Sequence, residues 1–311
     1  MQYLGEVISL GVACSWTVAA LASEIASRRL GVFVMNVWRM ALALVLSVIL
    51  MRCCSGTMGL QYASGEAWTW LLMSGVVGYF FGDWCLFNSY LTIGSRYGQL
   101  FMTLAPAFTV LSAWIMLGQV LSWSALLAMT VTLSGIIISV WHVDKKELPT
   151  KGILFGLGAA LGQGLGLVLS KLGLDAYEAS MPASLPAEVA DYLPFSANSV
   201  RCMAGLVCFT AWYYWMRPKF RKEQLTFTDS FRNRRGLIAM IIAVFSGPFI
   251  GVGFSLMAVQ YTAAGIASTL MATTPILILL PSRWLFGQEI TFRNVLGAII
   301  SVVGVSLFFL L

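Results

Sequence analysis

The chain has 311 residues, of which 59% are apolar and only 10% charged, and its mean hydropathy is +0.84. A soluble domain of this size carries about a quarter charged residues, so the composition excludes a soluble globular protein and indicates a membrane protein. The net charge of +6 favours orientation in a bilayer over nucleic-acid binding, because the basic residues lie between apolar runs.

Apolar runs recur along the whole chain, and each is long enough to cross about 30 Å of hydrocarbon as a helix. Helices are expected rather than strands, because an unpaired backbone amide in hydrocarbon costs several kcal/mol. We therefore predict an all-α polytopic membrane protein with ten transmembrane helices, at residues 3–22, 32–51, 68–90, 97–117, 122–141, 152–173, 197–215, 236–260, 264–284 and 292–310.

The basic residues predict how these spans are oriented. Arginine and lysine gather in the loops after the odd-numbered spans, whereas the alternate loops and helix ends hold only Arg52 and Lys171. Because cytoplasmic loops carry the excess of basic residues, we expect the odd-numbered loops in the cytoplasm and both termini outside it, in the cytoplasmic (inner) membrane of the cell. The basic run from 217 to 235 is expected to be a solvated, orienting face.

The sequence offers little for an enzyme or a cofactor. The six cysteines lack metal-ligand spacing, no phosphate-cradling Gly-x4-Gly-Lys-Ser/Thr loop is present, and the lone His142 has no partner motif. We expect neither catalysis nor a bound metal or cofactor.

An internal repeat appears when the chain is shifted along itself. A shift of 169 residues aligns ten positions without a gap, namely Gly78/Gly247, Phe80/Phe249, Gly82/Gly251, Met102/Met271, Pro106/Pro275, Leu111/Leu280, Gly118/Gly287, Gln119/Gln288, Leu127/Leu296 and Gly135/Gly304. Nearer the start of each copy the shift falls to 162, which pairs Arg39 with Arg201, and then to 147, which pairs two faces of small residues. Those faces are Gly11, Ser15, Ala19, Ser23 and Gly158, Gly162, Gly166, Ser170.

The repeat predicts the domain organisation. The first five-helix copy covers 1–141, a cytoplasmic linker covers 142–151, and the second copy covers 152–311. Since five is an odd number of spans, the second copy must enter the membrane from the opposite side, giving inverted-topology repeats. Such repeats can exchange conformations, which alternating access requires. The small faces serve either close helix packing or sliding of the two copies.

The repeated motifs resemble a known family. Pro106, Gly118-Gln119 and Gly135 in the first copy, and Pro275, Gly287-Gln288 and Gly304 in the second, are similar to the repeated block of ten-helix EamA-type permeases in the drug/metabolite transporter superfamily. The arginine early in the second helix of each copy also resembles that family. The family usually has Gly-Glu where this chain has Gly-Gln. The resemblance implies secondary transport of small metabolites, amino acids or drugs, commonly outward, through a central cavity.

Only three ionisable residues lie well inside the predicted spans: Arg39, Asp83 and Arg201. Each is a candidate site residue, because a charge within the bilayer costs at least about 2.5–3.5 kcal/mol on insertion scales. Arg39 and Asp83 lie at the same predicted depth on consecutive antiparallel helices. Asp83 is therefore a structural partner of Arg39, a proton or cation carrier, or part of a water-lined cavity wall.

Other candidates surround these three residues. Tyr79 and Phe87 share a helical face with Asp83 and form either a substrate wall or ordinary packing. Trp16 and Gln163 occupy equivalent positions in the two copies and are expected to face the same cavity. The segment 246–253 contains a proline and three glycines, which predict a kinked or broken helix.

Arg201 differs from Arg39 in having no carboxylate mate, because the residue equivalent to Asp83 is Val252. It either binds an anionic substrate group through its planar fork or reaches the membrane interface.

We expect a secondary active transporter that exports small metabolites, with a small-molecule substrate, the lipid bilayer and a coupling proton or cation as its partners. One alternative is a gradient-independent exchanger of nucleotide sugars or phosphorylated metabolites. Another is a receptor or scaffold without flux. The substrate, the direction of flux and the oligomeric state are left open.

Overall fold

The computed structural model describes residues 4–56, 60–118, 123–140, 148–182, 193–216, 227–261, 270–271 and 273–310. These residues are almost entirely helical, and no strand occurs among them. Gln119, His142, most of the predicted cytoplasmic linker and the start of the predicted span 264–284 lie outside the described residues.

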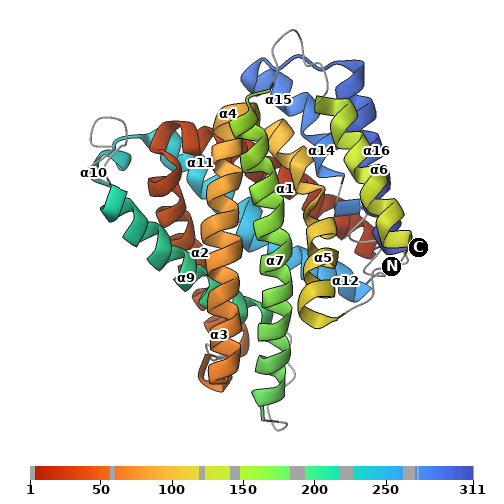
Figure 1. Ribbon diagram of the computed structural model, residues 1–311. Coiled ribbons are helices and arrows are strands. Elements are labelled where there is room, and N and C mark those ends of the chain that lie inside the picture. The colour runs from red at the N-terminus through yellow and green to blue at the C-terminus, as the bar shows by residue number, and fades with distance from the viewer. Residues whose placement is uncertain are drawn as a thin grey trace.

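Figure 1 shows the arrangement of the described helices. Two of the segments, η2 and η3, are π-helical, and η1 is a 3-10 turn. The elements are α1 (Leu4–Leu30), α2 (Val32–Ser55), η1 (Leu60–Tyr62), α3 (Gly65–Ser74), η2 (Gly75–Gly82), α4 (Asp83–Met102), α5 (Ala105–Leu117), α6 (Trp123–Val140), α7 (Thr150–Ser180), α9 (Leu193–Met216), α10 (Phe227–Ser230), α11 (Arg234–Val244), η3 (Phe245–Phe249), α12 (Ile250–Tyr261), α14 (Thr274–Leu277), α15 (Leu279–Phe286) and α16 (Phe292–Leu310).

Several of these helices are able to cross a membrane. Among the described residues, five helical stretches are long and apolar enough, at Leu4–Leu30, Val32–Cys54, Gly65–Met102, Thr150–Ser180 and Arg234–Val252. Four shorter apolar helices accompany them, at Ala105–Met116, Leu126–Ser139, Thr274–Phe286 and Phe292–Leu307. The chain is thus a helical multi-pass membrane protein, and the count of ten spans stays a prediction.

The predicted boundaries need correction around the fourth and ninth spans. A loop is expected between 90 and 97, and there the structure has a non-helical residue, Gly94 (φ 83°, ψ 157°), where two helical stretches of α4 meet at a kink. A second break follows at Thr103 and Leu104, just before Pro106 and inside the predicted span 97–117. In the second copy, Thr273 is likewise non-helical before Pro275. Hydropathy does not register such breaks, whereas proline, which lacks an N–H, favours a helix start at that point.

The first helix of each copy packs on the third helix of the other copy. Helix α1 lies on α11, η3 and α12, while α7 lies on α3, η2, α4 and α5. In Figure 1, α7 runs beside α4 through the middle of the molecule. The second helices, α2 and α9, pack on each other, as do the last helices, α6 and α16. Helix α1 begins and α16 ends near the same edge of the bundle (Figure 1).

The crossing of α6 and α16 is self-complementary. A Cβ atom added to Gly135 would collide with Ser301, and one added to Gly304 would collide with Thr132. Gly304 and Ser301 are the repeat equivalents of Gly135 and Thr132, so the same contact occurs twice with the copies exchanged. This reciprocity is the mark of a two-fold relation between the copies. The small residues allow the two backbones to approach closely.

The small-residue faces of α1 and α7 contact the π-helical segments at equivalent points. A Cβ atom on Gly162 would lie 3.1 Å from the carbonyl oxygen of Val77 in η2. On the other side, Ser15 Oγ donates a hydrogen bond of 2.7 Å to the carbonyl oxygen of Ser246 in η3. Ser15 is the repeat equivalent of Gly162, and Ser246 is the repeat equivalent of Val77. The predicted kink in 246–253 is therefore a π-helical segment, and the first copy contains one too.

Candidate functional site

Asp83 lies at a buried junction of three helices. Its Oδ2 accepts from Arg39 Nη1 in a salt bridge whose side chains are 3% and 11% exposed, respectively. Its Oδ1 accepts a hydrogen bond of 3.2 Å from Gln163 Nε2 on α7. The Phe87 ring covers the guanidinium, with its centroid 5.1 Å from Arg39 Cζ. Because both carboxylate oxygens are engaged, the ion pair meets the condition under which a buried charge is tolerated.

Tyr79 lies one helical turn before Asp83 and connects this junction to α9. Its hydroxyl donates to Asn198 Oδ1, and its ring centroid lies 4.5 Å from Arg201 Cζ. Since Tyr79 and Asp83 are four residues apart, they lie on one face of the helix formed by η2 and α4. The two repeat-related arginines therefore contact the same helix, Arg39 at Asp83 and Arg201 at Tyr79.

The two arginines differ in their partners. Arg39 has a carboxylate, whereas the described residues provide no ion pair to Arg201. Arg201 Nε is buried without a hydrogen-bond partner within the described parts of the chain, and so is Asn198 Nδ2. Buried side-chain donors are usually paired in folded proteins. The Arg201 side of the cluster therefore differs from the Arg39 side in having two unpaired donors among the described residues.

Most of the residues predicted from sequence meet here. The structure brings together Arg39, Tyr79, Asp83, Phe87, Gln163 and Arg201. Trp16 lies elsewhere, packed against Gly251 of α12 and against a small cluster formed by Val12, Ala258 and Met271. Because α1 packs on the second copy's third helix, Trp16 meets a region where Val252 replaces the carboxylate.

Asn198 is a member of the cluster that the sequence analysis missed. It is 3% exposed and lies three residues before Arg201, so both share one face of α9. Its spacing to Arg201 equals that of Asn36 to Arg39, and this repeated Asn-x-x-Arg pattern was the available signal.

Glu24 is a second residue that the sequence analysis missed. It lies on α1 and contacts α4 beside the turn at Gly94. The predicted first span ends at 22, but α1 continues to Leu30 and leaves Glu24 fully buried. Its Oε2 accepts a hydrogen bond of 2.6 Å from the backbone N–H of Ser95, and its Oε1 accepts from Arg28 at 2.8 Å. The turn at Gly94 interrupts the helix and exposes the Ser95 amide, which an acidic side chain satisfies well.

Arg96 is another buried charged residue that the sequence analysis did not anticipate. It is 5% exposed, and its Nη1 donates to the carbonyl oxygen of Glu289 at 2.6 Å. Its Nη2 donates to Tyr97 Oη at 2.9 Å, which also accepts from Asn294 Nδ2 at 3.2 Å. These bonds tie α4 to the connection before α16. Contacts between segments about 190 residues apart leave no local signal in the sequence.

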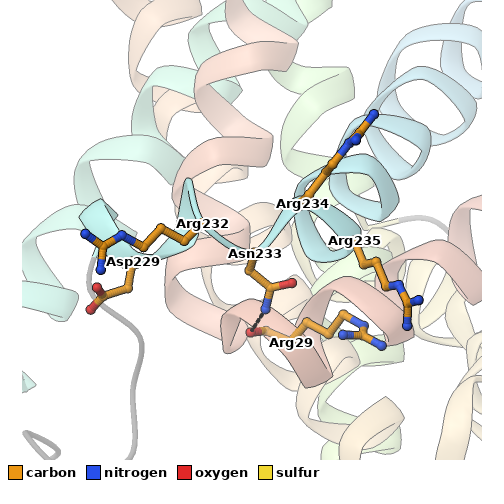
Figure 2. A pocket seen from close by; sticks show the side chains of 6 residues that line it. All are labelled: Arg29, Asp229, Arg232, Asn233, Arg234 and Arg235. Carbon is orange, nitrogen blue, oxygen red and sulfur yellow. Dashed lines mark hydrogen bonds between the residues drawn. The ribbon is translucent and has the colours of Figure 1, made fainter.

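Two surface depressions lie apart from the cluster. One is lined by Arg29, Asp229, Arg232, Asn233, Arg234 and Arg235. Figure 2 shows Arg29 and Arg235 side by side, Arg234 pointing away from them, and Asn233 donating a hydrogen bond of 3.0 Å to the Arg29 carbonyl. The other depression is apolar, lies between α1 and α12, and is lined by Ile8, Gly11, Val12, Ile250 and Phe254.

The fold and the site together define a class of protein: a helical multi-pass membrane protein made of two copies of one unit, with charged side chains buried where the copies meet. The model of the EamA-like transporter family matches residues 3–141 and 150–310, so the chain belongs to this family. The resemblance drawn from the repeated motifs is thereby confirmed. Proteins of this family are transporters rather than enzymes.

A solved structure described as "Crystal structure of protein" has the same fold, with a TM-score of 0.61 at 14% identity. The alignment covers 100% of this chain and 98% of that chain. At this identity the likeness shows the fold alone. A search of curated proteins found no match.

Proposed function

We propose that the chain is a secondary active transporter that exports small metabolites, such as amino acids or drug-like compounds. It works by alternating access around a central site between two inverted five-helix repeats, 1–141 and 152–311, joined by a cytoplasmic linker at 142–151. It lies in the inner membrane with both termini outside the cytoplasm. The observation that carries the proposal is the position of Asp83, which Arg39 holds from one copy and Gln163 from the other.

Unequal packing of the two copies supports alternating access. A Cβ atom on Gly158 of α7 would lie 2.9 Å from Cys85 Sγ, whereas one on the equivalent Gly11 of α1 would have nothing within 4 Å. Gly11 also lines the apolar depression between α1 and α12. The same contact is therefore closed on one side and open on the other. Inverted repeats that rock against each other exchange such a pair of states.

Asp83 is the proposed coupling residue. A carboxylate that gains a proton loses the charge that holds Arg39, and the contact between α2 and α4 then weakens. Its second bond, to Gln163, would pass this change to α7 and the other copy. Coupling by a proton or another cation follows from the same geometry, because a bound cation also competes with Arg39 for the carboxylate.

A second candidate is gradient-independent exchange of nucleotide sugars or other phosphorylated metabolites. It is favoured by the two arginines that contact one helix a turn apart, because guanidinium groups bind phosphate in a bidentate manner. In that mechanism Arg39 would leave Asp83 for the substrate, and no ion gradient would be needed. A receptor or scaffold would retain the same fold without flux.

Flux measurements separate these candidates. The purified protein is placed in liposomes, a proton gradient drives a mixed pool of amino acids and metabolites, and mass spectrometry records what crosses. We expect gradient-driven flux in the wild type and gradient-insensitive exchange in Asp83→Asn. Asp175→Asn is the matched control, because Asp175 lies on α7 with its side chain 56% exposed. Wild-type flux that does not depend on the gradient would favour the exchanger. The absence of flux for every compound would favour a receptor or scaffold.

A further inference from the structure

We infer that Asn198 and Arg201, positioned by Tyr79, form a subsite for a carboxylate group on the substrate. The inference rests on the proposed function, because it concerns the chemistry that the same buried cluster would recognise. It names Asn198 as a substrate-binding residue and a monocarboxylate as the ligand class.

The two donors of the subsite are unpaired and belong to the same helix. Arg201 Nε and Asn198 Nδ2 are buried without a hydrogen-bond partner among the described residues. The two residues are three positions apart on α9, so their side chains lie on one face of that helix. One donor carries a positive charge and the other is neutral. An acceptor with two oxygen atoms and a single negative charge would satisfy both.

Tyr79 acts as the positioning residue. Its hydroxyl donates to Asn198 Oδ1, which occupies the amide oxygen and leaves the Nδ2 group as the free end. Its ring holds the Arg201 guanidinium, with 4.5 Å between the ring centroid and Cζ. One side chain therefore fixes both donors before a ligand arrives, which reduces the conformational freedom lost on binding.

The equivalent asparagine and arginine of the first copy have partners that their counterparts in the second copy lack. There the same Asn-x-x-Arg spacing places Asn36 and Arg39, but Arg39 is neutralised by Asp83. Asn36 Nδ2 is also used, since it donates to the Val32 carbonyl at 2.9 Å. In the second copy Val252 replaces the carboxylate, and neither donor has a partner in the described parts of the chain. We infer that a carboxylate of the substrate takes the place of the protein carboxylate that the second copy lacks.

Charge balance selects a carboxylate over a phosphate ester. Arg39 is already paired with Asp83, so Arg201 alone is available to neutralise a ligand at this level of the helix. One guanidinium balances a single negative charge, whereas a phosphate monoester carries nearly two at neutral pH. Because unpaired charge is costly away from water, the monoanion is the better fit.

The experiment measures binding directly. Thermal unfolding of the purified protein is followed by tryptophan fluorescence while acetate, propionate and N-acetylleucine are each titrated beside the corresponding amide, at constant ionic strength. We expect at least one carboxylate to stabilise the wild type with a Kd at least tenfold lower than that of its amide. Phenyl phosphate is added as a phosphate ester and is expected to bind more weakly than the best carboxylate.

Variants then locate the site. Hydrogen bonds to charged groups imply that Asn198→Leu and Arg201→Gln each weaken carboxylate binding about ten- to hundredfold, with little effect on the amide. Tyr79→Phe keeps the ring over Arg201 and releases Asn198, so a smaller loss of carboxylate preference is expected. Asn36→Leu is the matched control and should retain the preference. If Asn198→Leu does not fold, Tyr79→Phe and Arg201→Gln still report on the subsite.

The outcomes are distinguishable from those of the flux experiment. Equal binding of carboxylates and amides by the wild type overturns the subsite, even if flux is normal. Carboxylate preference that survives Arg201→Gln overturns it as well. Carboxylate preference without flux in liposomes would retain the subsite and contradict the proposed transport. Tighter binding of phenyl phosphate than of every carboxylate would contradict the ligand class.

Discussion

The two copies share their packing but differ in their chemistry. Each has a π-helical segment in its third helix, and each uses that segment to contact a small-residue face of the other copy's first helix. Only the first copy adds a carboxylate, which meets Arg39 directly after its π-helical segment. The second has Val252 at that position and leaves Arg201 without an ion pair within the described residues.

Packing contacts are therefore easier to duplicate than buried charges. Glycine and serine contacts cost little to repeat, whereas each ion within the bilayer requires its own partners. Asp83 has two such partners, from α2 and α7. π-helical turns often accompany functional sites, and here the one that directly precedes Asp83 is the longer of the two, at 8 residues against 5.

The largest expected effect comes from breaking the ion pair that only the first copy has. Asp83→Leu leaves Arg39 buried without a counter-charge and should lower the free energy of unfolding by about 3–5 kcal/mol. Replacing both residues, as Arg39→Met with Asp83→Leu, should recover most of this loss while gradient-driven flux stays absent. Denaturant or thermal unfolding of the purified variants provides the measurement. A double variant as unstable as the single one would contradict this account of the pair.

A smaller effect is expected where the copies share their packing. Gly162→Leu introduces a Cβ atom 2.6 Å from Gly82 Cα, and overpacking of this kind costs roughly 1–3 kcal/mol. Gly11→Leu is the control, because a Cβ atom there has nothing within 4 Å. Thermal unfolding and the yield of monodisperse protein would be compared. Equal losses in both variants would show that the close approach of α7 to η2 is unimportant.

The smallest effect concerns the C-terminal ends of the first helices of the two copies. Glu24 and Arg28 correspond in the repeat to Lys171 and Asp175, and both pairs form salt bridges. Glu24→Leu removes the acceptor for the Ser95 N–H and should cost roughly 1–2 kcal/mol. Lys171→Leu should change stability little, because its side chain is 66% exposed. Hydrogen exchange at the Ser95 amide would report the lost bond, and unchanged protection would contradict the assignment.

The sequence predicted well what depends on local pattern and on neighbouring helices. The apolar runs located α2 and α16 to within a few residues at each end. Arg39 and Asp83 were placed at one depth because they lie on consecutive antiparallel helices, and the structure has them in contact. The proline and glycines of 246–253 indicated a distorted helix, and η3 lies there.

What the sequence did not reveal depends on contacts between distant segments. The bond from Tyr79 to Asn198 joins residues 119 positions apart, and no periodicity reports such a pair. Glu24 was missed because α1 continues beyond its apolar run, where burial comes from α4 rather than from lipid. The positive φ of Gly94 is similarly invisible, because glycine alone does not say which conformation it adopts.

The reciprocal crossing of α6 and α16 has a consequence for any exchange between the copies. Swapping the roles of the two copies turns the Gly135–Ser301 contact into the Gly304–Thr132 contact, so the crossing maps onto itself. The contacts of α1 and α7, in contrast, trade places. In the proposed alternating access, the α6–α16 pair would be the stationary pivot of this motion. Changes there would then affect the inward-open and outward-open forms equally, whereas changes on α1 or α7 would favour one form over the other.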